Sequence, residues 1–239
     1  MRTFTFIFIA ALTVSISVSA QTTLTNRAFE TGTRAAKAKE YKKAIGDYRR
    51  AILFSETERW SDDFLARIHF NIGVCFYHLK RNSEAVEEFT EAIKLSRRSY
   101  QKAFYALGLA HSEMKNWRKA KTAFREAVNL EREDGEAWFD LAMVLLEEKN
   151  FDAAEKSFHN AIKYKSTGAA DAHNNLGVIY ALKNDFPLAE NEFKTALVES
   201  NGKSIEARNN LEFCKLYKQN FSRELLAKLE FSRKNKQGE

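Results

Sequence analysis

The sequence predicts an all-α protein, a solenoid of helix-turn-helix repeats that ends in a C-terminal capping helix. Three observations support this prediction. Glycine and proline number only 9 and 1 among 239 residues, too few for a β-rich chain that turns about every 8 to 12 residues. Alanine, leucine, glutamate and lysine, which favour helices, are abundant. A pattern of small and aromatic residues also recurs about every 35 residues, which is typical of stacked repeats.

Residues 1–20 differ from the rest of the chain. Arg2 is their only charged residue, Phe4 to Val18 form a mostly apolar run, and Val18-Ser19-Ala20 places small residues before Gln21. This pattern predicts a signal peptide that is cleaved after Ala20, and therefore an exported protein that is periplasmic or secreted. A spanning helix needs roughly 20 apolar residues, so a retained membrane anchor is the less favoured alternative.

Five units of the chain share one register. Their eighth position is small, with spacings of 41, 35, 34 and 35 residues: Gly32, Gly73, Gly108, Ala142 and Gly177. Twelve residues later stands an alanine in every unit: Ala44, Ala85, Ala120, Ala154 and Ala189. An aromatic ring follows four residues on, at Tyr48, Phe89, Phe124, Phe158 and Phe193, and a second alanine three beyond it, at Ala51, Ala92, Ala127, Ala161 and Ala196. Small residues allow two helices to cross closely, and the ring fills the adjoining gap.

This register resembles the tetratricopeptide-repeat (TPR) family, whose unit is a pair of antiparallel helices in about 34 residues. The segment AHNNLGVIYALKNDFPLAENEFKTAL of the fifth unit matches the family pattern best. The resemblance implies a right-handed α-solenoid of five repeats, at residues 25–58, 66–99, 101–134, 135–168 and 170–203.

Some positions depart from the family pattern. The first unit has Thr31 and Ala35 where leucine and tyrosine are usual, and the second has Asn82 in place of the aromatic residue after the turn. Seven extra residues separate the first two units, which predicts a longer surface loop containing Trp60.

Residues 204–239 lose the register and are predicted to be cap helices and a tail. Ile205 to Tyr217 has the pattern of another first helix, and Phe221 to Phe231 of a weaker second one. The last hydrophobic face of a repeat array has to be covered by a helix with a polar outer side, which Glu212, Lys215 and Lys218 would supply.

The sequence indicates neither an enzyme nor a cofactor or metal site. It contains no phosphate-binding loop, no zinc or nucleophile motif, and five histidines without metal-ligand spacing. Cys75 and Cys214 lie four repeats apart, so we predict two separate buried thiols. Without Arg2 the net charge falls from +6 to +5, and basic residues are mixed with acidic ones, so we expect no nucleic-acid partner. Since no catalytic motif is present, we also expect no small-molecule substrate.

The TPR resemblance also implies a ligand groove lined by the first helices of the repeats. Their fifth, sixth and ninth positions supply rings, amides and aliphatic side chains, which are typical of peptide-binding surfaces. The candidate groove residues are Phe29, Phe70, Tyr105, Leu109, Phe139, Met143, Asn174, Val178, Asn71 and Asn175. The alternative is that the rings are partly buried packing residues and nothing more.

Charges at groove positions sort along the chain. Lys37, Arg67, His78 and Lys102 lie in the early repeats, and Glu136, Glu147, Asp171 and Glu206 in the later ones, with Glu113 as an exception. A ligand with an acidic and a basic part would be oriented by such a field, although chance sorting remains an alternative.

Two function classes follow. The first is an adaptor or scaffold that holds a protein or peptide partner in the groove, in an extracytoplasmic compartment. The alternative is a structural subunit of an envelope or secretion assembly that docks by its convex face or its caps. An enzyme would need a site made between chains, and no residue pattern motivates one.

Overall fold

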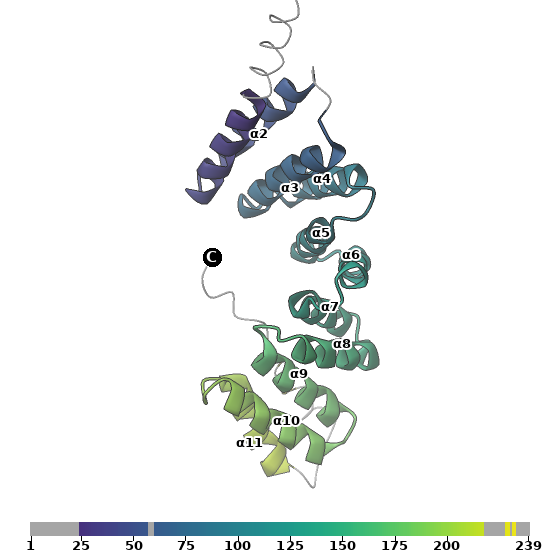
Figure 1. Cartoon of the computed structure of the whole chain (residues 1–239). Coiled ribbons are helices and arrows are strands. Elements are labelled where there is room, and N and C mark those ends of the chain that lie inside the picture. The colour runs from purple at the N-terminus through teal and green to yellow at the C-terminus, as the bar shows by residue number, and fades with distance from the viewer. Residues whose placement is uncertain (1–23, 57–59, 218–227, 230, 233–239) are drawn as a thin grey trace, which may run out of the picture. The chain divides into compact units, whose positions relative to one another are not determined.

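The computed structural model describes residues 24–56, 60–217, 228–229 and 231–232 (Figure 1). Within these ranges every regular element is a helix, as predicted for an all-α repeat protein. The chain forms two compact units that meet between residues 116 and 117. This boundary divides the third predicted repeat between its two helices.

Unit 1 is a stack of antiparallel helices. Its first helix is described over residues 24–37 and is followed by α2 (Tyr41–Ser55), α3 (Asp62–His78), α4 (Asn82–Leu95) and α5 (Gln101–Glu113). Helix α2 packs on α3, α3 on α4 and α4 on α5 (Figure 1). Ile68 and Ile72 of α3 lie in the core between the rings Tyr48 and Phe89 of the flanking helices.

Unit 2 repeats the same arrangement. Its helices are α6 (Trp117–Leu130), α7 (Gly135–Glu147), α8 (Phe151–Lys163), α9 (Ala169–Leu182), α10 (Phe186–Glu199) and α11 (Ile205–Tyr217). Each packs on its neighbour in sequence, and α11 also contacts α9 (Figure 1). The helix predicted at 205–217 is therefore present at the end of the array.

The predicted packing register is confirmed. All ten alanines of the register are fully buried, and all five rings are at most 2% exposed. A Cβ atom at Gly73 would lie 2.6 Å from the Phe89 ring, and one at Gly177 would lie 2.5 Å from the Phe193 ring. The small eighth residue is thus required because the ring of the following helix fills the space where a side chain would stand.

The turns inside the repeats share one backbone conformation. The first helix of each repeat is followed by a residue with positive φ, between +56° and +64°: Lys39, Lys80, Lys115, Lys149 and Asn184. After α7, the Lys149 N–H donates to the Leu146 carbonyl (2.8 Å) and the Asn150 N–H to the Leu145 carbonyl (2.9 Å), a Schellman motif. Side-chain caps start the second helices α8 and α10. Asn150 Oδ1 accepts from the Ala153 N–H (3.3 Å), and Asp185 Oδ1 accepts from the Leu188 N–H (3.2 Å).

The loop between the first two repeats differs in extent from the prediction. Helix α3 begins at Asp62, ahead of the predicted repeat start at 66, because Ser61 Oγ caps it by accepting from the Phe64 N–H (3.2 Å). Trp60 stacks on Phe64 with ring centroids 4.5 Å apart. Part of the loop, residues 57–59, is outside the described residues.

The remaining predictions on the chain ends are answered only in part. The predicted signal peptide at 1–20 and the predicted tail at 234–239 lie outside the described residues, as does most of the predicted second cap helix at 221–231. Its described residues Lys228, Leu229 and Phe231 are not helical. Both cysteines are buried free thiols, as predicted. Among the helices described, none is long and apolar enough to span a membrane.

Candidate functional site

The first helices of the repeats present one surface in each unit, which we call the A-helix face. In unit 1 this face holds several half-buried aromatic rings. Phe29 lies 5.7 Å from Tyr48 and 5.3 Å from Phe64 between ring centroids, and Phe70 lies 5.1 Å from Tyr100. Phe29, Phe70 and Tyr100 are each half-buried. Half-burial agrees both with the predicted groove and with its alternative, that the rings are partly buried packing residues.

Arg67 adds a cation to these rings. Its guanidinium lies 5.6 Å from the centroid of the Phe29 ring, and the side chain is exposed. Burial raises the pKa of the Tyr100 hydroxyl, and the charge of Arg67 acts against this shift. A cation above an aromatic face can still pair with an incoming carboxylate.

The other candidates of unit 1 are also accessible. Tyr105, Leu109 and Asn71 are half-buried, and Lys102 is exposed. Sequence reasoning missed Phe64 and Tyr100, because both stand ahead of the expected repeat starts. The only local signal was the i, i+4 spacing of Trp60 and Phe64, which favours a contact on one face of a helix.

Four candidates of unit 2, Phe139, Val178, Asn174 and Asn175, are buried rather than exposed. The expectation of an accessible ring at Phe139 is therefore wrong. Phe139 is fully buried, edge-on to Phe158 at 5.6 Å, and a Cβ at Gly168 would lie 3.0 Å from its ring. The start of α9 therefore covers this ring. Val178 is 1% exposed and belongs to a buried cluster with Phe193, Leu211 and Cys214, which we call the terminal hydrophobic cluster. Met143, in contrast, is half-buried.

The charges of the A-helix face divide by unit. The four basic positions, Lys37, Arg67, His78 and Lys102, belong to unit 1, and the four acidic ones, Glu136, Glu147, Asp171 and Glu206, to unit 2. Several of them have partners within the protein, as Arg67 has in the Phe29 ring. His78 stacks on Tyr41 at 4.7 Å, and Glu136 Oε1 accepts from the Thr167 N–H at 2.6 Å.

Unit 2 contains a buried group of amides on its A-helix face, Asn174, Asn175 and Asn210, which we call the asparagine cluster. All three are at most 1% exposed. Asn210 Nδ2 donates to Asn174 Oδ1 (2.9 Å). Asn175 Nδ2 also lies 3.5 Å from the Met143 sulfur. The structure thus brings together three predicted residues, Met143, Asn174 and Asn175.

The asparagine cluster holds a segment of the C-terminal region through its backbone. The Ser232 N–H donates to Asn175 Oδ1 (2.7 Å), and Asn175 Nδ2 donates to the Ser232 carbonyl (2.8 Å). Asn174 Nδ2 donates to Ser232 Oγ (3.0 Å). Ser232 is 2% exposed. The Asn175 amide therefore bonds both the N–H and the carbonyl of one residue. These two bonds do not depend on the side chain of that residue.

Apolar contacts support the same segment. Leu229 is 8% exposed and joins the terminal hydrophobic cluster with Val178, Leu211 and Cys214. Phe231 packs against that cluster while remaining half-buried. Sequence reasoning did not connect Ser232 with Asn175, because a segment that does not repeat carries no register that would place it.

Titratable side chains link first and second helices. His69 Nδ1 lies 2.7 Å from Glu88 Oε2, and the equivalent His173 lies 2.6 Å from Glu192. Burial, followed by the charge of Glu155, raises the pKa of Tyr180 to about 12, so its hydroxyl stays protonated. Among the residues described, no three His, Cys, Asp or Glu side chains are grouped as metal ligands.

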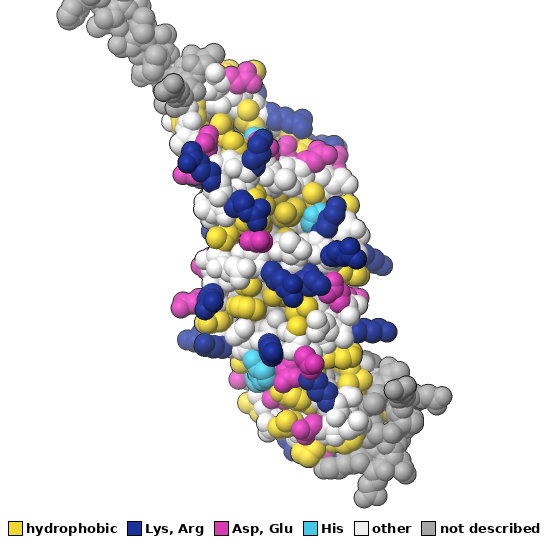
Figure 2. Space-filling model, turned by 90° about the vertical axis from the view of Figure 1, so that its right-hand side faces the viewer, with side chains coloured by type: hydrophobic (Ala, Val, Ile, Leu, Met, Phe, Trp, Pro, Cys, Tyr) yellow, Lys and Arg dark blue, Asp and Glu magenta, His cyan; other side chains and the backbone are white. Residues whose placement is uncertain are grey.

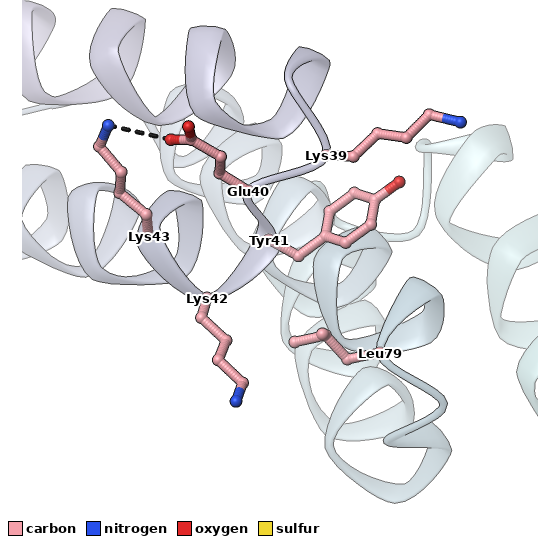
Figure 3. A pocket seen from close by; sticks show the side chains of 6 residues that line it. All are labelled: Lys39, Glu40, Tyr41, Lys42, Lys43 and Leu79. Carbon is pink, nitrogen blue, oxygen red and sulfur yellow. Dashed lines mark hydrogen bonds and ion pairs between the residues drawn. The ribbon is translucent and has the colours of Figure 1, made fainter.

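A hollow of about 580 Å³ opens at the first turn of unit 1 (Figure 3). Lys39, Glu40, Tyr41, Lys42, Lys43 and Leu79 line it. Lys43 pairs with Glu40 at 2.9 Å, while the Lys39 and Lys42 side chains point in different directions (Figure 3). These cations do not converge on a point, so the hollow is a poor site for a small ligand.

The second helices are polar with scattered apolar side chains. Arg118, Lys119 and Arg125 of α6 are exposed, and Lys and Arg side chains stand among acidic ones over the surface seen in Figure 2. Such mixing differs from the continuous basic stripe of a nucleic-acid interface. Large apolar side chains are exposed on these helices at Leu53, Leu130, Leu188 and Val198.

The fold and these faces define a helical-repeat protein of the interaction-scaffold class. Models of the tetratricopeptide repeat match residues 66–99, 105–158 and 145–204, together more than half of the chain. The chain belongs to the tetratricopeptide-repeat family. TPR proteins bind protein or peptide partners, and their fold is typically a non-enzymatic scaffold.

Two curated relatives match over shorter stretches. The chain is 31% identical over 87 residues to anaphase-promoting complex subunit 3 of Schizosaccharomyces pombe and 30% identical over 100 residues to heat shock protein STI1 of Saccharomyces cerevisiae. These matches include 36% and 42% of this chain. The chain spans only 13% and 16% of the length of these relatives.

Solved structures share the fold over most of the chain. YrrB, described as a TPR protein with an unusual peptide-binding site, has a TM-score of 0.65 at 22% identity, covering 77% of this chain and 90% of YrrB. A MamA structure has a TM-score of 0.65 at 20% identity, covering 75% and 93%. PilF of Pseudomonas aeruginosa has a TM-score of 0.62 at 23% identity, covering 77% and 80%. At these identities the likeness shows the fold.

Proposed function

We propose that this protein is an extracytoplasmic TPR adaptor that holds a segment of a partner protein in a groove formed by its first helices. The observation that carries this proposal is the pair of hydrogen bonds between Asn175 and the Ser232 backbone. In this contact the A-helix face of unit 2 holds a non-helical segment of the same chain through its main chain, which supports the proposal. The half-buried rings Phe29, Phe70 and Tyr105 of unit 1 would add apolar contacts.

An acidic partner segment suits the charges of unit 1, and a basic segment suits those of unit 2. Arg67 and Lys102 of unit 1 are exposed cations, while unit 2 contributes the acidic positions Glu147 and Asp171. Such a field speeds and orients encounter more than it tightens binding, and it weakens as salt rises. The proposed role involves no catalysis, no cofactor and no nucleic acid.

Export rests on the sequence of residues 1–20. A short apolar run followed by small residues favours secretion and cleavage after Ala20. Expression of the full chain in a bacterium with an intact secretion system should give a protein outside the cytoplasm whose first residue is Gln21. A mature protein that retains residues 1–20 in the membrane fraction would instead identify an anchor.

The groove proposal can be tested by affinity capture from an envelope extract, with captured proteins identified by mass spectrometry. The test variant is Phe70→Glu with Tyr105→Glu, since Phe139 is fully buried and its replacement would unfold the repeat. The control variant places the same charges on second helices, at Leu53→Glu and Val198→Glu, which are 59% and 75% exposed. Partners lost with the test variant and kept by the control would support groove binding.

The same experiment addresses the alternative, a structural subunit that docks by its convex face or its caps. The exposed apolar side chains of the second helices, including Leu53 and Val198, favour this alternative. Partners that are lost only with the control variant would move the interface to that face. Circular dichroism of each variant establishes that the repeats remain folded.

The charge component has its own test. Arg67→Glu with Lys102→Glu should weaken capture of an acidic partner segment, and the loss should shrink as salt is raised. Lys42→Glu with Lys94→Glu changes the net charge equally on the second helices α2 and α4, where both side chains are exposed. If both double variants weakened capture equally, only the net charge of the protein would matter. That result would contradict specific recognition of an acidic segment by Arg67 and Lys102.

A further inference from the structure

The inference concerns the segment that contains Leu229, Phe231 and Ser232, which we call the C-terminal strap. It rests on the proposed peptide-binding function and concerns the regulation of the same face. The strap reaches the asparagine cluster from 57 residues away along the sequence, counted from Asn175 to Ser232. Its contacts are those that an independent peptide would make.

The polar contacts are directed at the main chain. Asn175 Oδ1 accepts a hydrogen bond from the Ser232 N–H, and Asn175 Nδ2 donates one to the Ser232 carbonyl. This pair of bonds would form with any residue except proline, which lacks the N–H. Asn174 donates to Ser232 Oγ, so the side chain adds a preference for a small hydroxyl residue. Asn210 in turn donates to Asn174 Oδ1 and fixes the orientation of that amide.

The apolar contacts select the flanking residues. Leu229 is 8% exposed within the terminal hydrophobic cluster, and Phe231 packs against the same cluster. Two apolar side chains two positions apart, followed by a hydroxyl residue, therefore describe what this surface accepts.

We propose that the C-terminal strap is a tethered ligand that occupies the unit 2 groove, and that a partner segment of the same chemistry binds by displacing it. The partner segment would have an apolar residue, any residue, an aromatic or aliphatic residue and then serine or threonine. Because a tethered segment competes at an effective concentration on the order of millimolar, it suppresses weak ligands and admits only better ones. The strap thus sets the affinity threshold of the groove.

The competition can be measured with the strap itself as the probe. A fluorescein-labelled peptide with the sequence LAKLEFSRKN, residues 226–235, is titrated with the chain from Gln21 onward and followed by anisotropy. The variant Ser232→Pro removes the N–H that donates to Asn175 and should free the groove. It should bind the probe at least about ten-fold more tightly than the parent chain.

Two controls keep the test independent of folding. Ser232→Ala in the chain retains both backbone hydrogen bonds and loses only the one from Asn174, so its probe affinity should lie between those of the parent and Ser232→Pro. A probe with proline at the position of Ser232 should bind neither chain, which locates binding at the Asn175 contact without altering the protein. In addition, Cys214, fully buried in the same cluster as Leu229, should react faster with a thiol reagent in Ser232→Pro than in Ser232→Ala.

Three outcomes would overturn the inference. Equal probe affinity for the parent and Ser232→Pro would mean that the strap does not block the groove. No binding of the probe to Ser232→Pro would make the strap a permanent cap rather than a ligand. A concentration-dependent dimer of the parent that Ser232→Pro abolishes, seen by sedimentation, would assign the groove to the strap of a second copy.

These outcomes are separable from the fate of the proposed function. Envelope partners that depend on Phe70 and Tyr105, together with no difference between the parent and Ser232→Pro, would keep the adaptor and remove the strap's role. A probe that behaves as expected, together with no captured partner in either chain, would establish the tethered ligand and contradict the adaptor.

Discussion

At the scale of single residues, the small eighth position and the ring of the following helix form one packing unit. The Cβ of an alanine at Gly73 would lie 2.6 Å from the Phe89 ring, closer than such atoms approach in real structures. The ring is 1% exposed and is surrounded by the core of unit 1, so it cannot move aside cheaply. Glycine is therefore a spacing requirement at this position.

Two glycine substitutions in unit 1 should change the free energy of unfolding in opposite directions. Gly73→Ala in α3 should lower the free energy of unfolding by about 1 to 3 kcal/mol, because it overpacks the contact with Phe89. Gly46→Ala in α2, where no atom lies within 4 Å of the added Cβ, should raise it by about 0.5 to 1 kcal/mol. Urea unfolding followed by circular dichroism measures both. Equal shifts would contradict the packing argument.

The reactivity of the buried Cys75 thiol in unit 1 should depend on pH and on folding. Burial raises the pKa of Cys75 to about 11, and its side chain is 1% exposed. Since the thiolate is the reactive form, Cys75 should be inert to a thiol reagent at pH 8 in the folded chain and react in denaturant. The variant Cys214→Ser isolates its signal. Rapid labelling of folded Cys75 at pH 8 would show that unit 1 opens readily there.

At the scale of elements, each first helix ends in a left-handed residue. Lysine occupies four of these five positions and asparagine the fifth, at Asn184. The left-handed conformation costs an L-residue with a Cβ roughly 1 to 2 kcal/mol relative to glycine, which explains the frequency of glycine at such helix ends. The chain therefore stores strain in the turn of every repeat.

That strain predicts a stabilising substitution. Lys149→Gly should raise the free energy of unfolding of unit 2 by about 1 kcal/mol, because φ at this residue is +56°. The matched control Lys156→Gly lies within α8, is also exposed, and should lower it by about 1 kcal/mol through lost helix propensity. Thermal unfolding of the two variants beside the parent measures the difference. A destabilising Lys149→Gly would mean that the lysine side chain makes a contact worth more than the strain.

The elements could be predicted because their constraint repeats. Every alanine and ring of the register was found buried, since one packing solution is used in each repeat. Features outside the register could not be read in this way. The burial of Phe139 depends on the start of α9 at Gly168, and the half-buried rings Phe64 and Tyr100 precede the expected repeat starts.

The contact of the strap with Asn175 could not be predicted from the sequence either, because the strap lies outside the repeat register. Asn174 and Asn175 were singled out by their repeat positions, but nothing periodic connects them with Ser232. Such a long-range contact depends on side-chain geometry that a single sequence does not display. The basic and acidic groove positions lie in different units, with Glu113 of unit 1 as the exception. The engagement of Glu136 with the Thr167 N–H was not foreseen.

At the scale of the whole molecule, stability should be distributed rather than global. Helices within each unit pack mainly on their neighbours in sequence, so a lost contact weakens the repeats that make it and is felt little elsewhere. The free energy of unfolding of such an array is approximately the sum of the stabilities of its repeats and of the interfaces between neighbouring repeats. The two compact units provide a direct way to examine this expectation.

Phe89 and Phe193 are equivalent rings of the two units, 1% and 0% exposed, each filling the space beside a glycine. Phe89→Ala and Phe193→Ala should each cost about 3 to 5 kcal/mol at their own position. Native-state hydrogen exchange read by mass spectrometry should show lost protection in α3 and α4 for the first variant and in α9 and α10 for the second, with the other unit close to the parent. Both substitutions remove the same group from equivalent sites, so each variant is the control for the other. Protection lost evenly through both units in either variant would mean that the chain unfolds as one cooperative body, and the local reading of its stability would have to be abandoned.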